Sequence, residues 1–94
     1  MVGLTRSAAA EYGRLGVRIN AVCPSFANTA MLNDYLAASP KGREAAEHSL
    51  TRGIPMGRIG QVDEVVQAIL FAASAENSFM TGETLSVDGG LAAV

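Results

Sequence analysis

Few side chains in this sequence have a type and spacing that could support catalysis or metal binding. His48 could serve as an acid or base near neutral pH. It lies on a polar segment with Glu44 and Glu47, without a nucleophile or metal ligand at useful spacing, which favours a solvated surface position. His48 is the only histidine and Cys23 the only cysteine, so the composition argues against a transition-metal site.

Two acidic motifs have structural explanations that we prefer to a catalytic one. Asp63 and Glu64 stand in the first turn of a predicted helix, where the helix dipole favours negative charge. Asp88-Gly89-Gly90 follows a predicted strand, and its glycines permit backbone angles closed to other residues, which predicts a turn. Cys23 is predicted to be a buried small hydrophobic side chain rather than a nucleophile.

The loop Pro24–Thr29 is the segment best placed to contact a ligand. It follows a predicted strand over 17–23, and open α/β sheets bind ligands at the carboxyl ends of their strands. The structural alternative is a loop that only ends the strand and caps the next helix. On the residues alone, both interpretations stay open.

Periodic apolar residues divide the chain into helices and strands. Residues 17–23 alternate as in a strand and are closed by Pro24, which cannot donate to a sheet ladder. Ser39-Pro40 is interpreted as the N-cap and first residue of the helix that follows. The expected elements are helix 1–13, strand 17–23, helix 30–38, helix 41–50, a turn-rich connector over 53–60, helix 61–74 and strand 83–87.

This order of elements predicts an α/β fold with parallel strands. A strand–helix–strand unit with a long connection pairs its strands in parallel through a right-handed crossover, as at one end of a doubly wound sheet. Two parallel strands leave the sheet faces under-covered, and the first helix has no N-cap before Met1. We therefore expect residues 1–94 to be a single partial domain whose partner strands lie upstream.

The composition excludes several classes of protein. The net charge is −2 and no basic cluster occurs, so no nucleic-acid partner is expected. No apolar run approaches the ~18 residues of a membrane-spanning helix, so no membrane partner is expected either. The single cysteine excludes an internal disulfide and fits a reducing, cytoplasmic location.

Ordered motifs run through nearly the whole chain. They are Gly3-Leu4-Thr5-Arg6, Gly16-Val17-Arg18-Ile19-Asn20-Ala21-Val22-Cys23-Pro24, Thr29-Ala30-Met31, Ile54-Pro55-Met56-Gly57-Arg58-Ile59-Gly60, Asp63-Glu64-Val65 and the tail from Ser78 to Gly90. Their order and spacing resemble the C-terminal portion of short-chain dehydrogenases/reductases. The resemblance implies a Rossmann-like, doubly wound parallel sheet.

The resemblance also implies an NAD or NADP cofactor and hydride transfer between its nicotinamide and an alcohol or ketone. The family pattern Pro-Gly-x-x-x-Thr falls on Pro24–Thr29, where Thr29 would hold the nicotinamide carboxamide through its hydroxyl and Ala27 through its backbone. Ser25 replaces the usual glycine, which would cost about 1 kcal/mol if that position needed a positive φ. The implied cofactor-binding residues are Pro24, Ser25, Ala27 and Thr29.

By the same resemblance, residues 30–53 form a lid over the substrate. Met31, Leu32 and Tyr35 would wall an apolar pocket for a small-molecule alcohol or ketone; their alternative role is ordinary helix packing. The family's assemblies use the first helix and the last strand of this region as interfaces, which implies a homo-oligomer, either a dimer or a tetramer.

The family's glycine-rich dinucleotide turn and its catalytic serine, tyrosine and lysine have no counterpart in these residues. They would precede Met1, so no catalytic residue is assigned within the sequence, and we expect the 94 residues alone to be inactive. Two alternatives stay open. The chain could be a non-catalytic truncated remnant or assembly module, or one half of a split enzyme completed by a separate chain.

Overall fold

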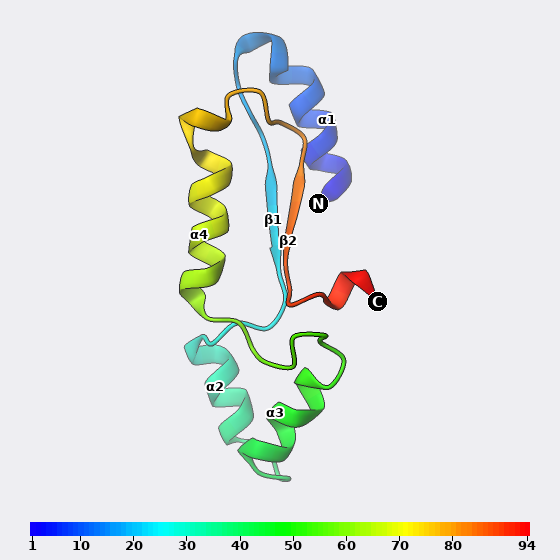
Figure 1. The fold of residues 1–94 in the computed structure, drawn as a ribbon, viewed down its shortest axis with the longest axis vertical. Coiled ribbons are helices and arrows are strands. Elements are labelled where there is room, and N and C mark those ends of the chain that lie inside the picture. The colour runs from blue at the N-terminus through cyan, green and yellow to red at the C-terminus, as the bar shows by residue number, and fades with distance from the viewer.

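The computed structural model describes all of residues 1–94 as an elongated molecule of 52 × 23 × 20 Å (Figure 1). Its radius of gyration is 16.3 Å, well above the roughly 12 Å of a compact chain of this length. A small sheet flanked by helices forms one end, and a helical pair forms the other. None of the helices combines the length and hydropathy that a bilayer span requires.

The sheet consists of strand β1, Ala21–Pro24, and strand β2, Thr84–Val87. The two strands run in parallel, and Ala21 lies opposite Thr84. The long connection between them contains all the residues of the predicted lid and one further α-helix. This arrangement confirms the α/β class predicted from the order of elements.

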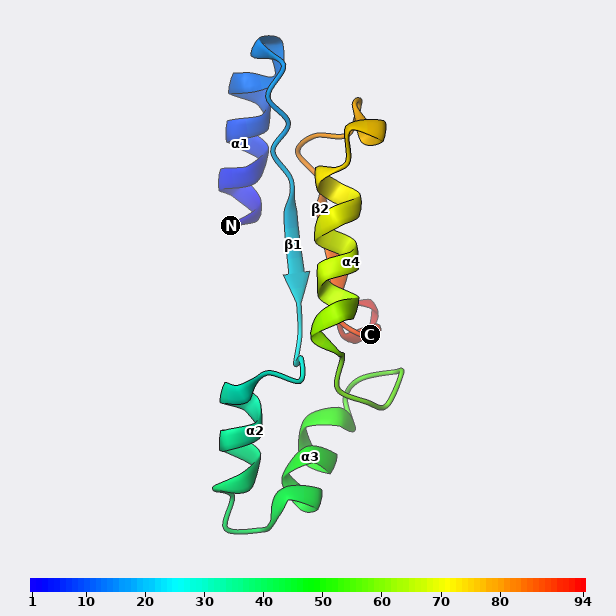
Figure 2. The same ribbon diagram turned by 90° about the vertical axis from the view of Figure 1, so that its left-hand side faces the viewer.

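Two helices cover opposite faces of the sheet. Helix α4, Val62–Ala73, lies on one face, and helix α1, Val2–Tyr12, lies on the other (Figures 1 and 2). Helix α1 approaches the segment before β2 so closely that a Cβ on Gly82 would lie 3.3 Å from the Cβ of Ala9. Both helices occur where the sequence predicts them, within two residues at each end.

The first strand is shorter than predicted, and it includes Pro24 instead of stopping before it. Ala21 and Ser25 donate their backbone N–H groups to carbonyl oxygens of the β2 segment at 2.9 and 3.3 Å. Because donors alternate along a strand, the nitrogen of Pro24 faces away from β2, and its missing N–H removes no bond from this ladder. Residues 17–20 lie outside the ladder.

The lid contains helix α2, Ala30–Ala37, and helix α3, Arg43–Thr51. Helix α2 is where it was predicted, but the prediction that Ser39-Pro40 begins the next helix is wrong. The backbone N–H of Gly42 donates to the carbonyl of Ser39 at 3.1 Å, so Ser39-Pro40 belongs to the turn between the helices. Gly42 has φ +90°, an angle that glycine adopts readily, and this lets the chain reverse before α3 begins.

The guanidinium of Arg18 holds the C-terminal end of α4. Its two terminal nitrogens donate to the carbonyl oxygens of Ala72, Ala73, Ser74 and Met80 at 2.9 to 3.4 Å. The last carbonyls of a helix have no partner within the helix, and a cation there is also favoured by the helix dipole. Arg18 therefore joins the end of α4 to the segment that leads into β1.

Replacing Arg18 by lysine should loosen this end of the sheet. A single ammonium group cannot reproduce the planar fork of a guanidinium, and losing the charged hydrogen bonds should destabilise the contact by about 1–3 kcal/mol. Amide hydrogen exchange at Asn77 and Met80 should accelerate in Arg18→Lys. It should not change in Arg14→Lys, which alters an exposed arginine; equal exchange in the two variants would contradict the role given to Arg18.

Apolar burial in the chain is sparse. Seven of the 94 residues are buried, and the hydrophobic ones are Ala9, Ala21, Leu36, Ile54 and Ile59. Helix α4 carries the broad apolar stripe predicted for it but fully buries none of its residues, and Leu70 is 60% exposed. The sheet faces are thus incompletely covered, as expected for two parallel strands with one helix on each side.

Candidate functional site

Backbone hydrogen bonds join the loop that follows β1 to the connector that leads into α4. Asn28 donates its backbone N–H to the carbonyl of Gly60 at 2.8 Å, and Gly60 donates its own to the carbonyl of Phe26 at 2.9 Å. These two bonds form an isolated parallel bridge between Ala27 and Gly60. The Pro24–Thr29 loop is therefore fixed at the carboxyl end of the sheet, where open α/β sheets bind ligands.

Thr29 is the N-cap of α2. Its hydroxyl oxygen accepts the backbone N–H of Leu32 at 3.2 Å, and its backbone N–H donates to the carbonyl of Ala27 at 2.7 Å. The loop therefore caps α2, as the structural interpretation predicts, and its contact with a ligand stays a prediction. Capping uses only the acceptor capacity of the hydroxyl, since a hydroxyl also carries one O–H donor.

Ser25 adopts an ordinary backbone conformation, because every residue with positive φ in the chain is a glycine. The strain considered for serine at this position is therefore absent. The Ser25 hydroxyl lies 3.5 Å from the carbonyl oxygen of Asp88, to which it donates. This contact joins the loop after β1 to the turn after β2.

Polar backbone groups of the loop remain available for a ligand. The N–H of Ala27 makes no hydrogen bond, and its carbonyl accepts only from Thr29. The O–H of Thr29 likewise has no acceptor within the chain. A primary carboxamide needs a donor for its oxygen and acceptors for its NH₂ group, so the groups of Ala27 and Thr29 fit a nicotinamide carboxamide.

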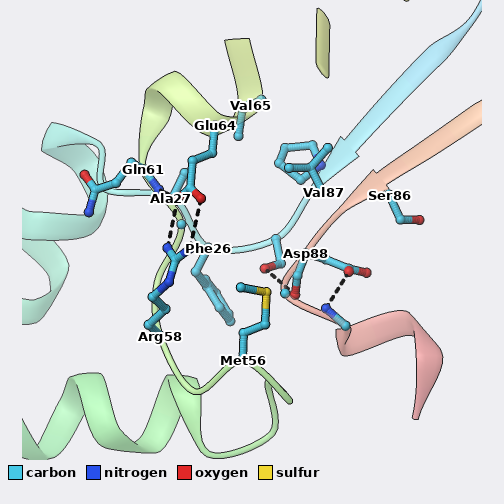
Figure 3. A pocket seen from close by; sticks show the side chains of 15 residues that line it. Phe26, Ala27, Met56, Arg58, Gln61, Glu64, Val65, Ser86, Val87 and Asp88 are labelled. Atoms are coloured by element: carbon cyan, nitrogen blue, oxygen red, sulfur yellow. Dashed lines mark hydrogen bonds and ion pairs between the residues drawn. The ribbon is translucent and has the colours of Figure 1, made fainter. Parts of the chain in front are cut away.

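A pocket of about 280 Å³ opens beside this loop (Figure 3). Pro24, Ser25 and Ala27 line it, together with Met56 of the connector and Asp88 of the turn after β2. The structure thus brings together three of the four predicted cofactor residues.

The remaining predicted site residues lie outside this pocket. Thr29, Met31, Leu32 and Tyr35 are absent from its lining. Met31 and Tyr35 are 83% and 63% exposed on α2, and Leu32 is half-buried. Within these 94 residues Met31 and Tyr35 therefore face open solvent, and the role of all three residues toward a substrate stays a prediction.

An ion pair in the lining of the pocket is not predicted by the sequence. Arg58 donates to both carboxylate oxygens of Glu64 at 2.8 and 2.9 Å (Figure 3). Glu64 also accepts the backbone N–H of Gln61 at 2.9 Å, the bond that a capping box makes at a helix start. The signal was present as Gln61 three residues before Glu64, but the partnership with Arg58 depends on the fold of the connector.

These bonds lower the pKa of Glu64 from its ordinary 4.5 to about 2, chiefly through the hydrogen bond from Arg58 and then that from Gln61. A carboxyl whose pKa is lower in the folded state stabilises the fold above its unfolded pKa, and this contribution is lost as pH falls toward 2. We expect NMR titration of the Glu64 carboxyl to give a pKa near 2 at low salt. In Arg58→Ala it should return toward 4.5; an unchanged value there would exclude Arg58 as the cause.

Asp88, His48 and Cys23 are the remaining residues considered for chemistry in the sequence. Asp88 accepts the backbone N–H groups of Gly90 and Ala92, both at 3.0 Å, which confirms the predicted turn. His48 is exposed on α3, as predicted. The prediction that Cys23 is buried is wrong for this chain, because Cys23 is only half-buried in a strand whose outer edge has no neighbour.

Comparison with known proteins places this arrangement in a family. A family model described as enoyl-(acyl carrier protein) reductase matches residues 1–92. An uncharacterized oxidoreductase of Thermotoga maritima is 45% identical over 94 residues, which are 100% of this chain and 37% of the relative. The 3-oxoacyl-[acyl-carrier-protein] reductase of the same organism is 43% identical over 91 residues, 97% of this chain and 34% of the relative.

Solved structures show the same fold. The structure described as ElxO with NADP bound has a TM-score of 0.87 and 35% identity, covering 99% of this chain and 36% of that one. This chain therefore spans little more than a third of the length of the proteins it matches. The match of the family model, the relatives and the fold together show that the chain belongs to the short-chain dehydrogenase/reductase family.

Proposed function

We propose that these residues form the nicotinamide-side loop and the substrate lid of an NAD(P)-dependent oxidoreductase that acts on an alcohol or ketone. Three features support this: the sequence relatives are oxidoreductases, a structural relative holds NADP, and the loop after β1 has unused polar groups suited to a carboxamide. The last feature carries the proposal, because it belongs to this chain's own geometry.

The proposed role of the loop is orientation. The bound dinucleotide would supply or accept the hydride. The N–H of Ala27 and the O–H of Thr29 would donate to the carboxamide oxygen, while the carbonyl of Ala27 would accept from its NH₂ group. Because the loop is already fixed through Gly60 and the cap on α2, little conformational entropy is lost when the amide binds. One face of the ring is then held toward the substrate.

The proposed role of the lid is to shape the substrate side of the same site. Met31, Leu32 and Tyr35 lie on α2 shortly after Thr29, so an apolar wall would begin two residues beyond the nicotinamide contact. Assembly of several copies through α1 and β2, expected from the family resemblance, stays a prediction. We assign no proton-transfer residue within the chain, and we propose that the 94 residues alone neither turn over substrate nor bind NAD(P)H tightly.

Variants of Thr29 test the nicotinamide contact. The protein to use is a graft in which residues 1–94 replace the matching third of the Thermotoga maritima 3-oxoacyl reductase. Thr29→Val keeps the side-chain shape but removes the cap and the carboxamide bond, so the KM for NADPH should rise roughly tenfold, as expected for one or two lost hydrogen bonds. Thr29→Ser retains both bonds and should stay within about twofold. Equal KM values in the two variants would contradict the assignment.

A further inference from the structure

A chain of side-chain hydrogen bonds links the lid to the loop and to the start of α4. Arg43 of α3 donates to the Oδ1 of Asn33 on α2 at 2.6 Å, and Asn33 donates through Nδ2 to the Oδ1 of Asn28 at 2.7 Å. Asn28 donates in turn through Nδ2 to the Oε1 of Gln61 at 3.3 Å. These four side chains come from both lid helices, the loop and the N-cap of α4.

The direction of every bond in this chain is determined by Arg43. A guanidinium can only donate, so Asn33 must turn its oxygen toward Arg43 and its NH₂ group toward Asn28. Asn28 must then accept from Asn33 and turn its own NH₂ group to Gln61. A carboxylate at either asparagine position would keep the bond it accepts but would have no N–H for the next residue. If the neighbouring amide rotates to donate instead, it gives up its own bond further along, so the chain loses one bond in either case.

The backbone places Asn28 where a shift would reach the proposed nicotinamide contact. Its own N–H is bonded to Gly60, and it lies between Ala27 and Thr29. Asn33 is bonded to the loop twice, since its backbone N–H also donates to the carbonyl of Thr29 at 3.0 Å. The bond between Asn33 and Asn28 therefore fixes the orientation of α2 relative to the loop. The bond from Arg43 to Asn33 fixes the orientation of α3 relative to α2.

We propose that Asn28 and Asn33 are positioning residues that hold the lid, residues 30–53, at a fixed orientation to the nicotinamide-side loop. This inference rests on the proposed function, because the lid and loop matter to catalysis only if they face the same substrate. Neither asparagine touches the reacting atoms. They keep Met31, Leu32 and Tyr35 of α2 at a constant distance and orientation from the proposed carboxamide contact.

Isosteric amide-to-carboxylate variants test the proposal. In the graft, Asn33→Asp should raise the KM for the carbonyl substrate roughly fivefold, the ratio given by one lost net hydrogen bond, while the KM for NADPH changes much less. Asn28→Asp should act in the same direction but less strongly, because its bond to Gln61 is long. The matched control is Gln67→Glu, the same chemical change on the exposed side of α4.

Two further measurements separate positioning from general destabilisation and from the proposed function itself. The effects of Arg43→Ala and Asn28→Asp should be non-additive although these residues share no bond, since both act through Asn33. In the 94-residue chain, amide exchange in α2 should accelerate in Asn33→Asp but not in Gln67→Glu. If exchange responds while every graft is folded but inactive, the hydrogen-bond chain does order α2 against the loop, and it is the proposed function that fails. If Asn33→Asp matches Gln67→Glu in both KM and exchange, the positioning role is wrong.

Discussion

Replacing Leu36 by alanine is expected to separate the two helices of the lid. Leu36 is fully buried, and it is the only large side chain in the protein without solvent exposure. Removing a buried leucine side chain typically costs about 2–5 kcal/mol, because a cavity adds to the lost transfer free energy. Thr51 is the only other buried residue of the lid, so little further burial holds its two helices together. Amide exchange across α2 and α3 should therefore accelerate by about 30-fold or more.

The matched control for this variant is Leu70→Ala on α4. Leu70 is 60% exposed, and substitutions at such positions usually change stability by no more than about 0.5 kcal/mol. Exchange in both lid helices should be the same as in the unaltered chain. If Leu36→Ala leaves lid exchange as slow as Leu70→Ala does, Leu36 does not hold α2 against α3.

Replacing Gly89 by alanine is expected to disrupt the turn after β2 and the pocket beside it. A Cβ on Gly89 would lie 2.6 Å from the Cγ2 of Ile54, and Gly89 has φ +63°. The backbone penalty of about 1–2 kcal/mol for an L-residue in this region adds to about 1–3 kcal/mol for overpacking a well-packed site. The carbonyl of Gly89 also accepts from Met56 at 3.0 Å, so the shift would reach the pocket lining.

Gly57→Ala is the matched control for the steric part of this effect. Gly57 has a similar φ of +72°, but no atom lies within 4 Å of the Cβ it would carry. It should therefore lose only the backbone contribution, about 1–2 kcal/mol. Urea denaturation of the two variants in the graft should show Gly89→Ala to be the less stable by about 1–3 kcal/mol. Equal urea midpoints and slopes in the two variants would show that the side chain of Ile54 moves away from the added Cβ at no measurable cost in stability.

The sequence predicted those elements whose formation depends on local residues. Helices α1, α2 and α4 follow apolar spacing and the acidic first turn of α4, and the Asp88 turn follows from its two glycines. The start of α3 was misplaced because Ser39-Pro40 has the composition of a helix start, whereas Gly42 supplies the actual chain reversal. The boundaries of β1 depend on which of its residues pair with β2. This pairing is a property of the sheet and cannot be recognised from residues 17–24 alone.

The parts of the site that escaped prediction depend on how the loop and the connector fold. Arg58 and Glu64 are six residues apart, but their ion pair depends on the path of the connector between them. Asn28 reaches Gln61 only because the loop after β1 lies against that connector. No local pattern signals such partners. The burial of Cys23 was overestimated for a related reason, since burial depends on what lies at the far edge of β1.

We propose that this chain supplies the nicotinamide-side loop and lid of an oxidoreductase and has no activity by itself. The most direct measurement is NADPH oxidation with a 3-oxoacyl substrate by three proteins: the 94-residue chain, the Thermotoga maritima reductase without its matching third, and the graft that joins them. We expect turnover in the graft alone. Turnover by the chain alone, or a folded graft without turnover, would contradict it.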